Sequence, residues 1–222
     1  MSKGYIEIDT SKWVRRTTFE WFKEFSNPTY CFNVKIDVSD ILAYSKESKT
    51  SFFINFLYVI SRVNNEIESL RLRYIDNKVL LFDRIDPTFT VKTTDGSFNN
   101  AGVMYNADYE TFYQSVKDEI ARRNGLTDNS QVYNKQVFNV FYSSCITTID
   151  IESATQPLNT NDKNSLNVPR IFWDKYRIEN GKTVLLLSMT VSHILIDGEE
   201  SSKAIQLVRQ YCSNFKSIIN KQ

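Results

Sequence analysis

The segment VLLLSMTVSHILIDG, which runs from Val184 to Gly198, sets the arrangement of the C-terminal part of the chain. Its first half is an apolar run of the kind that forms a buried strand, and the Asp197-Gly198 pair favours a tight turn after it. Beyond Gly198, apolar residues recur at helical spacing, as Ile205, Val208, Cys212, Phe215 and Ile219. The pattern predicts a strand over residues 183–191, a turn that carries a histidine, and a long amphipathic C-terminal helix.

The same reasoning gives the elements upstream. Alternating or apolar runs predict strands over residues 30–37, 70–75, 78–82, 88–92, 137–143, 145–151 and 168–176. Capping residues and helical spacing predict helices over 17–25, from Ser51 to about residue 64, and from Asp108 to residue 124. Turns are expected at residues 39–40 and 76–77, and polar loops over 126–134 and 159–167. Because strands and helices do not alternate regularly, the chain is predicted to be of the α+β class, a two-layer sandwich with a large mixed β-sheet covered by helices.

Bulk properties narrow the possible partners. The 222 residues are enough for a single domain, over residues 1–222, that buries its own core. A formal net charge of +1, with acidic and basic residues mixed along the chain, argues against nucleic acid or a membrane as partner. Three cysteines far apart, Cys31, Cys145 and Cys212, cannot close a complete disulfide framework. Since the N-terminus lacks the apolar core of a signal peptide and the apolar runs are too short to span a membrane, we expect a cytoplasmic protein.

His193 is the only histidine of the chain, which excludes mechanisms that need two imidazoles and most metal sites, so that no metal is expected. A lone histidine at a strand end can simply be a core residue. The H-x-x-x-D-G spacing favours a functional role, because a buried Asp197 needs a cationic partner and arginine is the best suited. Neither a G-x-G-x-x-G nor a G-x-x-x-x-G-K-[ST] loop occurs, which argues against a doubly wound nucleotide-binding fold.

The residues around this turn resemble a known family. The stretch Ser192-His193-Ile-Leu-Ile-Asp197-Gly198 is similar to the His-His-x-x-x-Asp-Gly signature of chloramphenicol acetyltransferases, with the second histidine kept. Further similar segments follow in collinear order: Lys12-Trp-Val-Arg-Arg-Thr-Thr-Phe19-Glu, Lys35-Ile-Asp37, Asp86-Pro-Thr-Phe-Thr-Val91, Lys175-Tyr176 and Gln210-Tyr-Cys212. The resemblance implies a chloramphenicol acetyltransferase-like fold, acetyl-coenzyme A as co-substrate, and a homotrimer with active sites between subunits.

The resemblance also assigns roles at the reaction centre. It implies that His193 is the general base that takes the proton of an acceptor hydroxyl, with its Nδ1 bonded to its own carbonyl oxygen. Thr148 stands where the family has a serine that stabilises the oxyanion; the alternative is a strand residue with a locally bonded hydroxyl. Asp197 would pair with Arg15 to support the site, and breaking a buried pair costs about 3–5 kcal/mol of stability.

Other positions concern binding. Lys175 and Tyr176 match positions that contact coenzyme A, although a solvated pair at a strand end is an equal alternative. The acceptor-pocket positions are matched by Trp21, Phe22, Tyr30 and Phe172. Phe22 replaces a tyrosine of the family and Phe172 replaces a threonine. The implied function is O-acetylation of a small-molecule acceptor, chloramphenicol. A different alcohol or amine acceptor, or a catalytically impaired trimeric binding protein on the same scaffold, are the alternatives.

Overall fold

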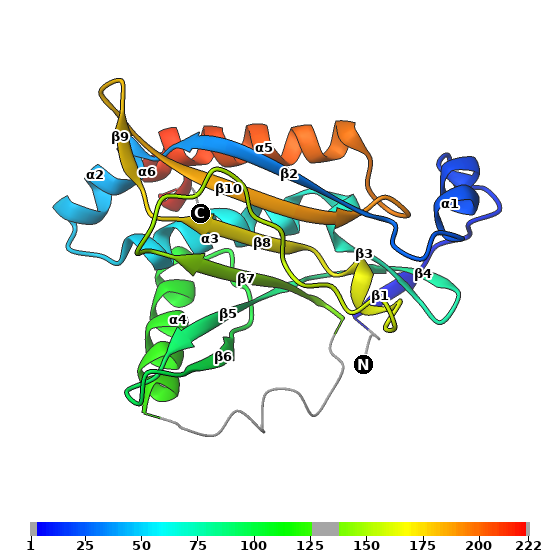
Figure 1. The fold of residues 1–222 in the computed structure, drawn as a ribbon, viewed down its shortest axis with the longest axis horizontal. Helices are drawn as coiled ribbons and strands as arrows, with labels where there is room; N and C mark the ends of the chain where they lie inside the picture. The colour runs from blue at the N-terminus through cyan, green and yellow to red at the C-terminus, as the bar shows by residue number, and fades with distance from the viewer. Residues whose placement is uncertain (1–3, 126–137, 221–222) are drawn as a thin grey trace.

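The computed structural model describes residues 4–125 and 138–220, and within them the largest element is a seven-stranded sheet (Figure 1). Its strands lie in the order β2 (Thr29–Asp37), β10 (Lys182–Ser192), β8 (Arg170–Asp174), β7 (Val140–Ile146), β5 (Asp86–Lys92) and β6 (Phe98–Gly102), and β9 (Arg177–Glu179) pairs with β10 beyond the end of β8. The β5–β7 and β7–β8 pairs are parallel and the other pairs of this sheet are antiparallel. The predicted mixed sheet is confirmed.

A smaller antiparallel sheet joins β1 (Tyr5–Glu7), β4 (Lys78–Phe82) and β3 (Leu72–Ile75), the last preceded by a 3₁₀ turn, Glu68–Arg71. β3 and β4 form the predicted hairpin. Its turn residues Asp76 and Asn77 have φ angles of 49° and 64°. These angles lie in the left-handed region, which aspartate and asparagine tolerate better than most other residues, so the turn chemistry explains the hairpin.

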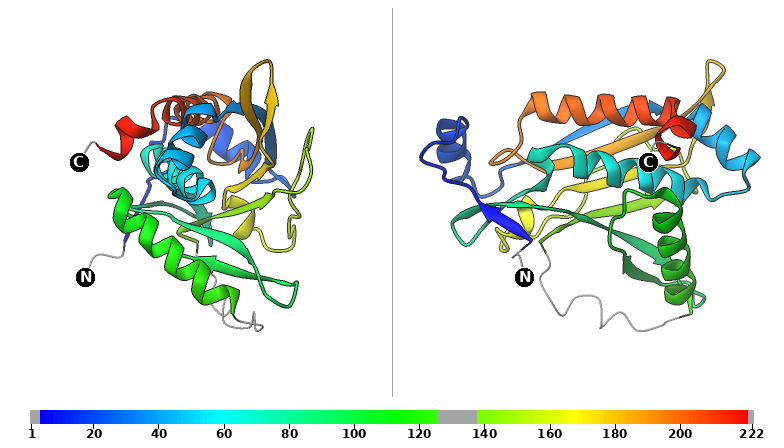
Figure 2. Two further views of the ribbon diagram at one scale, coloured as in Figure 1. Left: turned by 90° about the vertical axis from the view of Figure 1, so that its left-hand side faces the viewer. Right: turned by 180° about the vertical axis from the view of Figure 1, so that it is seen from behind.

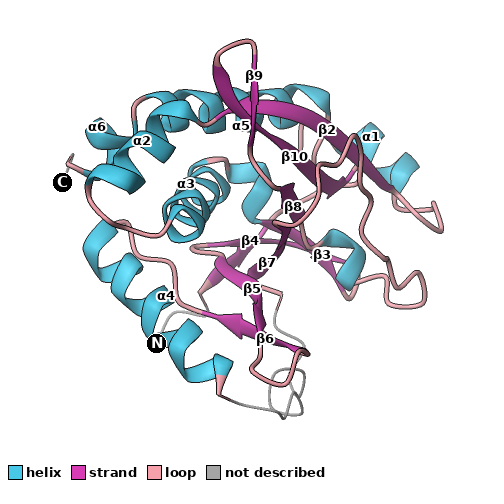
Figure 3. Cartoon of the chain, turned by 60° about the vertical axis from the view of Figure 1, so that its left-hand side comes forward, coloured by secondary structure: helices cyan, strands magenta, loops and turns pink. Residues whose placement is uncertain are grey.

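Helices form the second layer. α2 (Ser39–Glu47), α3 (Phe52–Glu66), α5 (Gly198–Ser213) and α6 (Phe215–Ile219) gather on one face of the large sheet, and α4 (Tyr109–Asn124) packs beside β5 and β6 (Figures 2 and 3). α3 is buried on nearly all sides, as its apolar composition predicts. Alternate residues of β10 enter the main core: Leu185, Leu187, Met189 and Val191. Since side chains alternate across a strand, the residues between them face the other side of the sheet.

That other face is crossed by the segment between β7 and β8, which within the described residues contains only a 3₁₀ turn, Ser165–Asn167 (Figure 2). The segment is hydrogen-bonded to the sheet. The Ser188 hydroxyl donates to the carbonyl of Ala154 (2.9 Å), and the N–H of Ala154 donates to Asn33 Oδ1 (3.0 Å). The first helix in chain order, α1 (Arg16–Phe22), stands at one end of the sheet, apart from the helical layer (Figure 1).

Some predicted elements were wrong. The turn predicted at residues 39–40 is the first turn of α2, because the Asp37 carboxylate accepts the N–H and hydroxyl of Ser39 and so starts the helix. The two strands predicted over 137–143 and 145–151 are one strand, β7, which ends at Ile146 opposite the last residue of β8. Residue 137 and the predicted loop 126–134 lie outside the described residues. β1, β6 and β9 were not predicted, because elements this short carry little periodicity.

The ends of three further elements also differ from the predictions. The helix predicted over 17–25 ends at Phe22, and the strand predicted over 168–176 ends at Asp174. The single long C-terminal helix is broken at Asn214, where φ is −133° and the side-chain amide donates to the carbonyl of Gln210 (2.9 Å). The break was not predicted because the apolar stripe continues through both helices, with Phe215 and Ile218 of α6 still buried.

Candidate active site

His193 lies where β10 ends, and its backbone and its ring are held separately. The backbone N–H donates to the carbonyl of Pro28 (2.8 Å). The half-buried imidazole stacks on Phe22, with ring centroids 4.0 Å apart and planes 10° apart, and Tyr30 lies against it at 4.7 Å. Two aromatic rings from α1 and β2 therefore fix the plane of the imidazole.

The expected bond from Nδ1 of His193 to its own carbonyl is not formed. Nδ1 is buried and has no hydrogen-bond partner among the described residues. The carbonyl oxygen of His193 faces Arg15 instead, whose Nη2 lies 3.4 Å away in donating geometry. The orientation of the ring thus comes from aromatic packing, and Arg15 holds the backbone of the turn.

Arg15 also faces Asp197 at the far side of the same turn. The distance from Arg15 Nε to Asp197 Oδ2 is 3.4 Å, and the two side chains are 13% and 39% exposed. The pair is therefore half open to water and differs from the buried pair considered from the sequence. Asp197 has a second task as the N-cap of α5, where its carboxylate accepts the N–H of Glu199 (3.3 Å).

Glu200 brings a second carboxyl group to Asp197. The pKa of Asp197 is lowered by a hydrogen bond with the Glu200 carboxyl, and also by the charge of Arg15 and the N–H groups at the start of α5. The pKa of Glu200 is raised by the same hydrogen bond with Asp197 and by burial. Two carboxyl groups this close do not both ionise freely, so Asp197 carries the charge and Glu200 holds its proton more tightly.

Only some of the aromatic residues proposed for the acceptor pocket lie together at His193. Phe22 and Tyr30 touch His193, and Trp21, which is 65% exposed, packs on Phe22 at 4.9 Å. The Tyr30 hydroxyl is already engaged, with the carbonyl of Ile196 at 3.2 Å and the Ser201 hydroxyl at 2.9 Å. Burial raises the pKa of Tyr30. Tyr30 therefore braces the turn between β10 and α5 through its hydroxyl.

Phe172 and Thr148 are remote from His193 within one chain. Phe172 pairs with Ser188, five residues before His193 on β10, which corresponds to about 16 Å along the strand. Thr148 follows the end of β7 and is exposed. The register connects Cys145 of β7 through Trp173 to Leu187, six residues before His193, so these ends of the sheet are about 20 Å apart or more. Figure 1 shows the end of β7 and the end of β10 on opposite sides.

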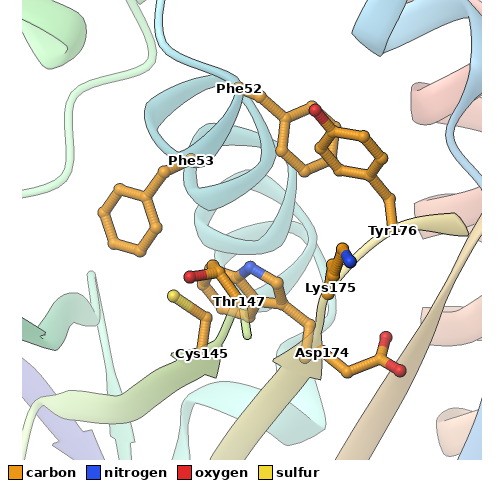
Figure 4. Close-up of a pocket in the computed structure, with 8 residues that line it drawn as sticks. Phe52, Phe53, Cys145, Thr147, Asp174, Lys175 and Tyr176 are labelled. Carbon is orange, nitrogen blue, oxygen red and sulfur yellow. The ribbon is translucent and has the colours of Figure 1, made fainter. Parts of the chain in front are cut away.

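A cavity of about 240 Å³ lies at the Thr148 end of the sheet, where the parallel strands β7 and β8 end beside the start of α3. It is lined by Phe52, Phe53, Cys145, Thr147, Trp173, Asp174, Lys175 and Tyr176 (Figure 4). The ring of Tyr176 meets Phe52 edge to face at 5.3 Å. The proposed coenzyme residues Lys175 and Tyr176 thus stand at an aromatic cavity with a lysine ammonium at its rim, which can take a ring or alkyl chain that bears phosphate.

The sequence did not indicate the other six of these lining residues. Phe52 and Phe53 belong to a helix that is apolar on nearly every side, so they could not be told from scaffold. Trp173 and Cys145 lie next to each other in the register of β8 and β7, which no local pattern reveals. Burial raises the pKa of the Cys145 thiol to about 11, so this sulfur is protonated at neutral pH and is a packing group of the cavity.

Residues 3–209 match the family model described as chloramphenicol acetyltransferase. The chain belongs to the chloramphenicol acetyltransferase family. This membership makes it an acyltransferase.

Relatives within the family are similar over nearly their whole length. The chain is 24% identical to the chloramphenicol acetyltransferase of Proteus mirabilis over 212 residues, which covers 94% of this chain and 95% of the relative. It is 25% identical to chloramphenicol acetyltransferase 3 of Escherichia coli over 216 residues, with 95% and 98% covered. A solved structure of a chloramphenicol acetyltransferase superposes with a TM-score of 0.86 at 27% identity and covers 93% of this chain and 100% of that one.

Two further observations concern the parts of the chain that the structure describes. Among residues 4–125 and 138–220, no three His, Cys, Asp or Glu side chains come together as metal ligands would. Within the same residues, each helix is too short or too polar to cross a membrane. The chloramphenicol acetyltransferase fold here thus presents two separate groups of functional candidates, one around His193 and one around the cavity beside Thr148.

Proposed function

We propose that the protein is an O-acetyltransferase that moves an acetyl group from acetyl-coenzyme A to a hydroxyl of chloramphenicol, with His193 as general base, and that residues 1–222 form one transferase domain. The observation that carries the proposal is the imidazole of His193, clamped between Phe22 and Tyr30 at a strand end and half open to solvent. Nδ1 of this ring has no hydrogen-bond partner within the described residues, so aromatic packing orients the imidazole.

The reaction needs one proton to be moved twice. His193 takes the proton of the acceptor hydroxyl while the oxygen of that hydroxyl attacks the carbonyl carbon of the thioester. The negative charge that forms on the carbonyl oxygen is stabilised by the hydroxyl of Thr148. When the carbon–sulfur bond breaks, the thiolate of coenzyme A takes the proton back from the imidazolium. No covalent bond to the protein forms.

The distance between His193 and Thr148 supports a homotrimer. Since the two residues lie at opposite ends of the sheet in one chain, a site that contains both has to form between two copies. Each end also exposes apolar side chains: Val14, Trp21 and Phe25 near His193, and Ile146, Ile149 and Ile178 near Thr148. A contact between two different surfaces of the same chain forms a closed ring when the rotation between copies closes, and a threefold rotation gives a three-membered ring in which every copy is satisfied.

Acetyl-coenzyme A as co-substrate is supported by the cavity beside Thr148. Its lining gives aromatic faces for the adenine or the pantetheine arm, and Lys175 gives a charge for phosphate. Cytoplasmic localisation is supported by the cysteines, because Cys31, Cys145 and Cys212 are all free thiols and suit a reducing compartment.

A second candidate is transfer of acetyl to a different alcohol or to an amine. It is favoured by the aromatic residues at His193, because Phe22 offers no hydroxyl, the hydroxyl of Tyr30 is engaged internally, and Phe172 is buried on another part of the sheet. These residues give shape and apolar area without the polar contacts that select one acceptor strongly.

The test mixes the purified protein with acetyl-coenzyme A and chloramphenicol and follows the free thiol that is released, with the protein's own three cysteines subtracted. The variant His193→Ala serves as control and should lose roughly 10²–10⁴-fold in kcat while remaining folded. Release with another acceptor alone would favour the second candidate. If the protein binds coenzyme A tightly but releases no thiol with any acceptor, and if the parent and His193→Ala do not differ in this, the binding-protein alternative remains.

A further inference from the structure

The chain makes a bulge between β8 and β9, where it passes the cavity beside Thr148. Trp173 pairs with Leu187, and Arg177 pairs with Val184. Between these pairs, residues 174–176 stand opposite residues 185–186, so one strand carries an extra residue. Such a bulge bends the strand and redirects side chains, and here it presents Lys175 and Tyr176 to the cavity.

The carboxylate of Asp174 accepts hydrogen bonds from backbone N–H groups on both sides of this bulge. Its side chain is fully buried. Oδ1 accepts the N–H of Leu186 at 2.6 Å, directly opposite the bulge. Oδ2 accepts the N–H of Ile151 at 3.0 Å and is paired with Arg177 Nη1 at 3.0 Å. One carboxylate thus connects β10, the β8–β9 bulge and the segment that follows β7.

The bond to Ile151 reaches a second part of the candidate site. Ile151 lies three residues after Thr148, and Thr147 of the same segment lines the cavity. This segment is exposed and has left the sheet after Ile146, so no strand pairing orders it. Figure 4 shows the carboxylate of Asp174 turned away from the aromatic rings of the cavity. Asp174 therefore acts through the backbone it holds, without a free oxygen for a ligand.

We propose that Asp174 is a positioning residue for the acetyl-coenzyme A side of the site: it holds the bulge with Lys175 and Tyr176 and the segment with Thr148 in one fixed arrangement. The inference rests on the proposed function. A fully buried carboxylate needs charge-assisted bonds to compensate its desolvation, and those of Asp174 join the bulge to Leu186 of β10 and to Arg177 and reach Ile151 in the segment with Thr148.

The variant Asp174→Asn tests the proposal. The amide keeps the size of the side chain but replaces one acceptor oxygen with a donor, which repels one of the two backbone N–H groups. We expect the KM for acetyl-coenzyme A to rise about tenfold or more and kcat to fall, because a charge-assisted bond is lost. The KM for the acceptor should stay within about twofold, since Asp174 bonds none of the aromatic residues, Phe22 and Tyr30, that lie at His193. This split separates positioning from a general loss of folded protein.

Arg177→Gln is the matched control. It removes the ion pairs of Arg177 with Asp174 and Glu179 but leaves both backbone bonds to Asp174, so the KM for acetyl-coenzyme A should change less than about threefold. If Asp174→Asn does not fold, Asp174→Glu replaces it: the charge stays, the oxygens move by one methylene, and the same rise in KM is expected. A KM within twofold of the parent for these Asp174 variants, or an equal rise in Arg177→Gln, overturns the inference.

Hydrogen exchange separates this inference from the proposed function, because it needs no turnover. In Asp174→Asn the amide of Ile151, whose N–H is bonded to Asp174 in the parent, should exchange at least tenfold faster than in the parent, and in Arg177→Gln it should not. Unchanged exchange in Asp174→Asn overturns the positioning role even in an active enzyme. If the parent protein releases no thiol with any acceptor, the proposed function is overturned. Faster exchange in Asp174→Asn than in that parent would still support the role of Asp174 in holding the segment.

Discussion

The ring of Phe22 lies face to face with the imidazole of His193, with centroids 4.0 Å and planes 10° apart. Phe22 is the last residue of α1, a short helix outside the helical layer, whereas His193 follows the last residue of β10. Because Nδ1 of His193 has no hydrogen-bond partner in the described chain, this stack and the contact with Tyr30 are what hold the ring. The placement of α1 therefore determines how the imidazole of the candidate site is held.

Removing the stack should slow the reaction. Phe22→Leu keeps apolar bulk but loses the aromatic face, whose contact is worth about 0.5–1.5 kcal/mol beyond burial. We expect kcat at saturating acceptor to fall by up to about tenfold. Phe22→Tyr keeps the ring and should retain kcat within about twofold. An equal kcat for Phe22→Leu and the parent would mean that packing does not orient His193.

Mixed subunits should restore activity if each site forms between two copies. Thr148→Ala alone should cost a few kcal/mol of barrier, as the loss of an oxyanion donor does, and His193→Ala alone should be nearly inactive. When equal amounts of the two variants are unfolded together and refolded as mixed rings, about one quarter of the interfaces combine an intact His193 with an intact Thr148. Activity near that fraction of the parent is the expected result. Activity no higher than that of the separate variants would contradict a shared site.

Breaking the pair between Arg15 and Asp197 should cost less stability than a buried pair would. Asp197 is 39% exposed, so water screens the pair, and the larger part of its contribution is the N-cap of α5. We expect Asp197→Ala to lower the free energy of unfolding by about 1–2 kcal/mol. Asp197→Asn, which retains a capping oxygen, should lower it by less than about 1 kcal/mol. Urea denaturation measures both values, and a loss above about 3 kcal/mol for Asp197→Asn would restore the buried-pair interpretation.

Glu200 should destabilise the fold more as pH rises. Its folded pKa is raised above the ordinary 4.5, so the folded state binds its proton more tightly than the unfolded state does. The stability linked to Glu200 is therefore fully present below about pH 4.5 and is lost as pH increases through the raised value. Asp197 has a folded pKa lowered from 3.8, so its contribution to stability is present above about pH 3.8 and is lost as pH falls through the lowered value. Glu200→Gln should consequently raise the melting temperature at pH 7–8 and leave it unchanged near pH 4; a lower melting temperature at pH 7–8 would reverse the sign assigned here.

Several parts of the fold followed from local sequence. The hairpin over Asp76 and Asn77 was predictable because few residues tolerate two successive positive φ angles. The caps of α3 and α4 were equally local, since the Ser51 hydroxyl and the Asp108 carboxylate each accept an N–H three residues later. α2 was missed, because Ser39 and Asp40 suit a turn as well as the first turn of a helix.

The sequence by itself determined the strand, turn and helix around His193, the identity of the one possible imidazole base, and the family to which these residues are similar. Only the tertiary structure decided which side chains meet. It brought Phe22 and Tyr30 onto His193, sent Thr148 to the opposite end of the sheet, and buried Phe172 opposite Ser188, five residues along β10 from His193. The reason is physical: hydrophobic periodicity fixes which face of an element is buried, whereas contacts between elements depend on strand register between segments far apart in the chain.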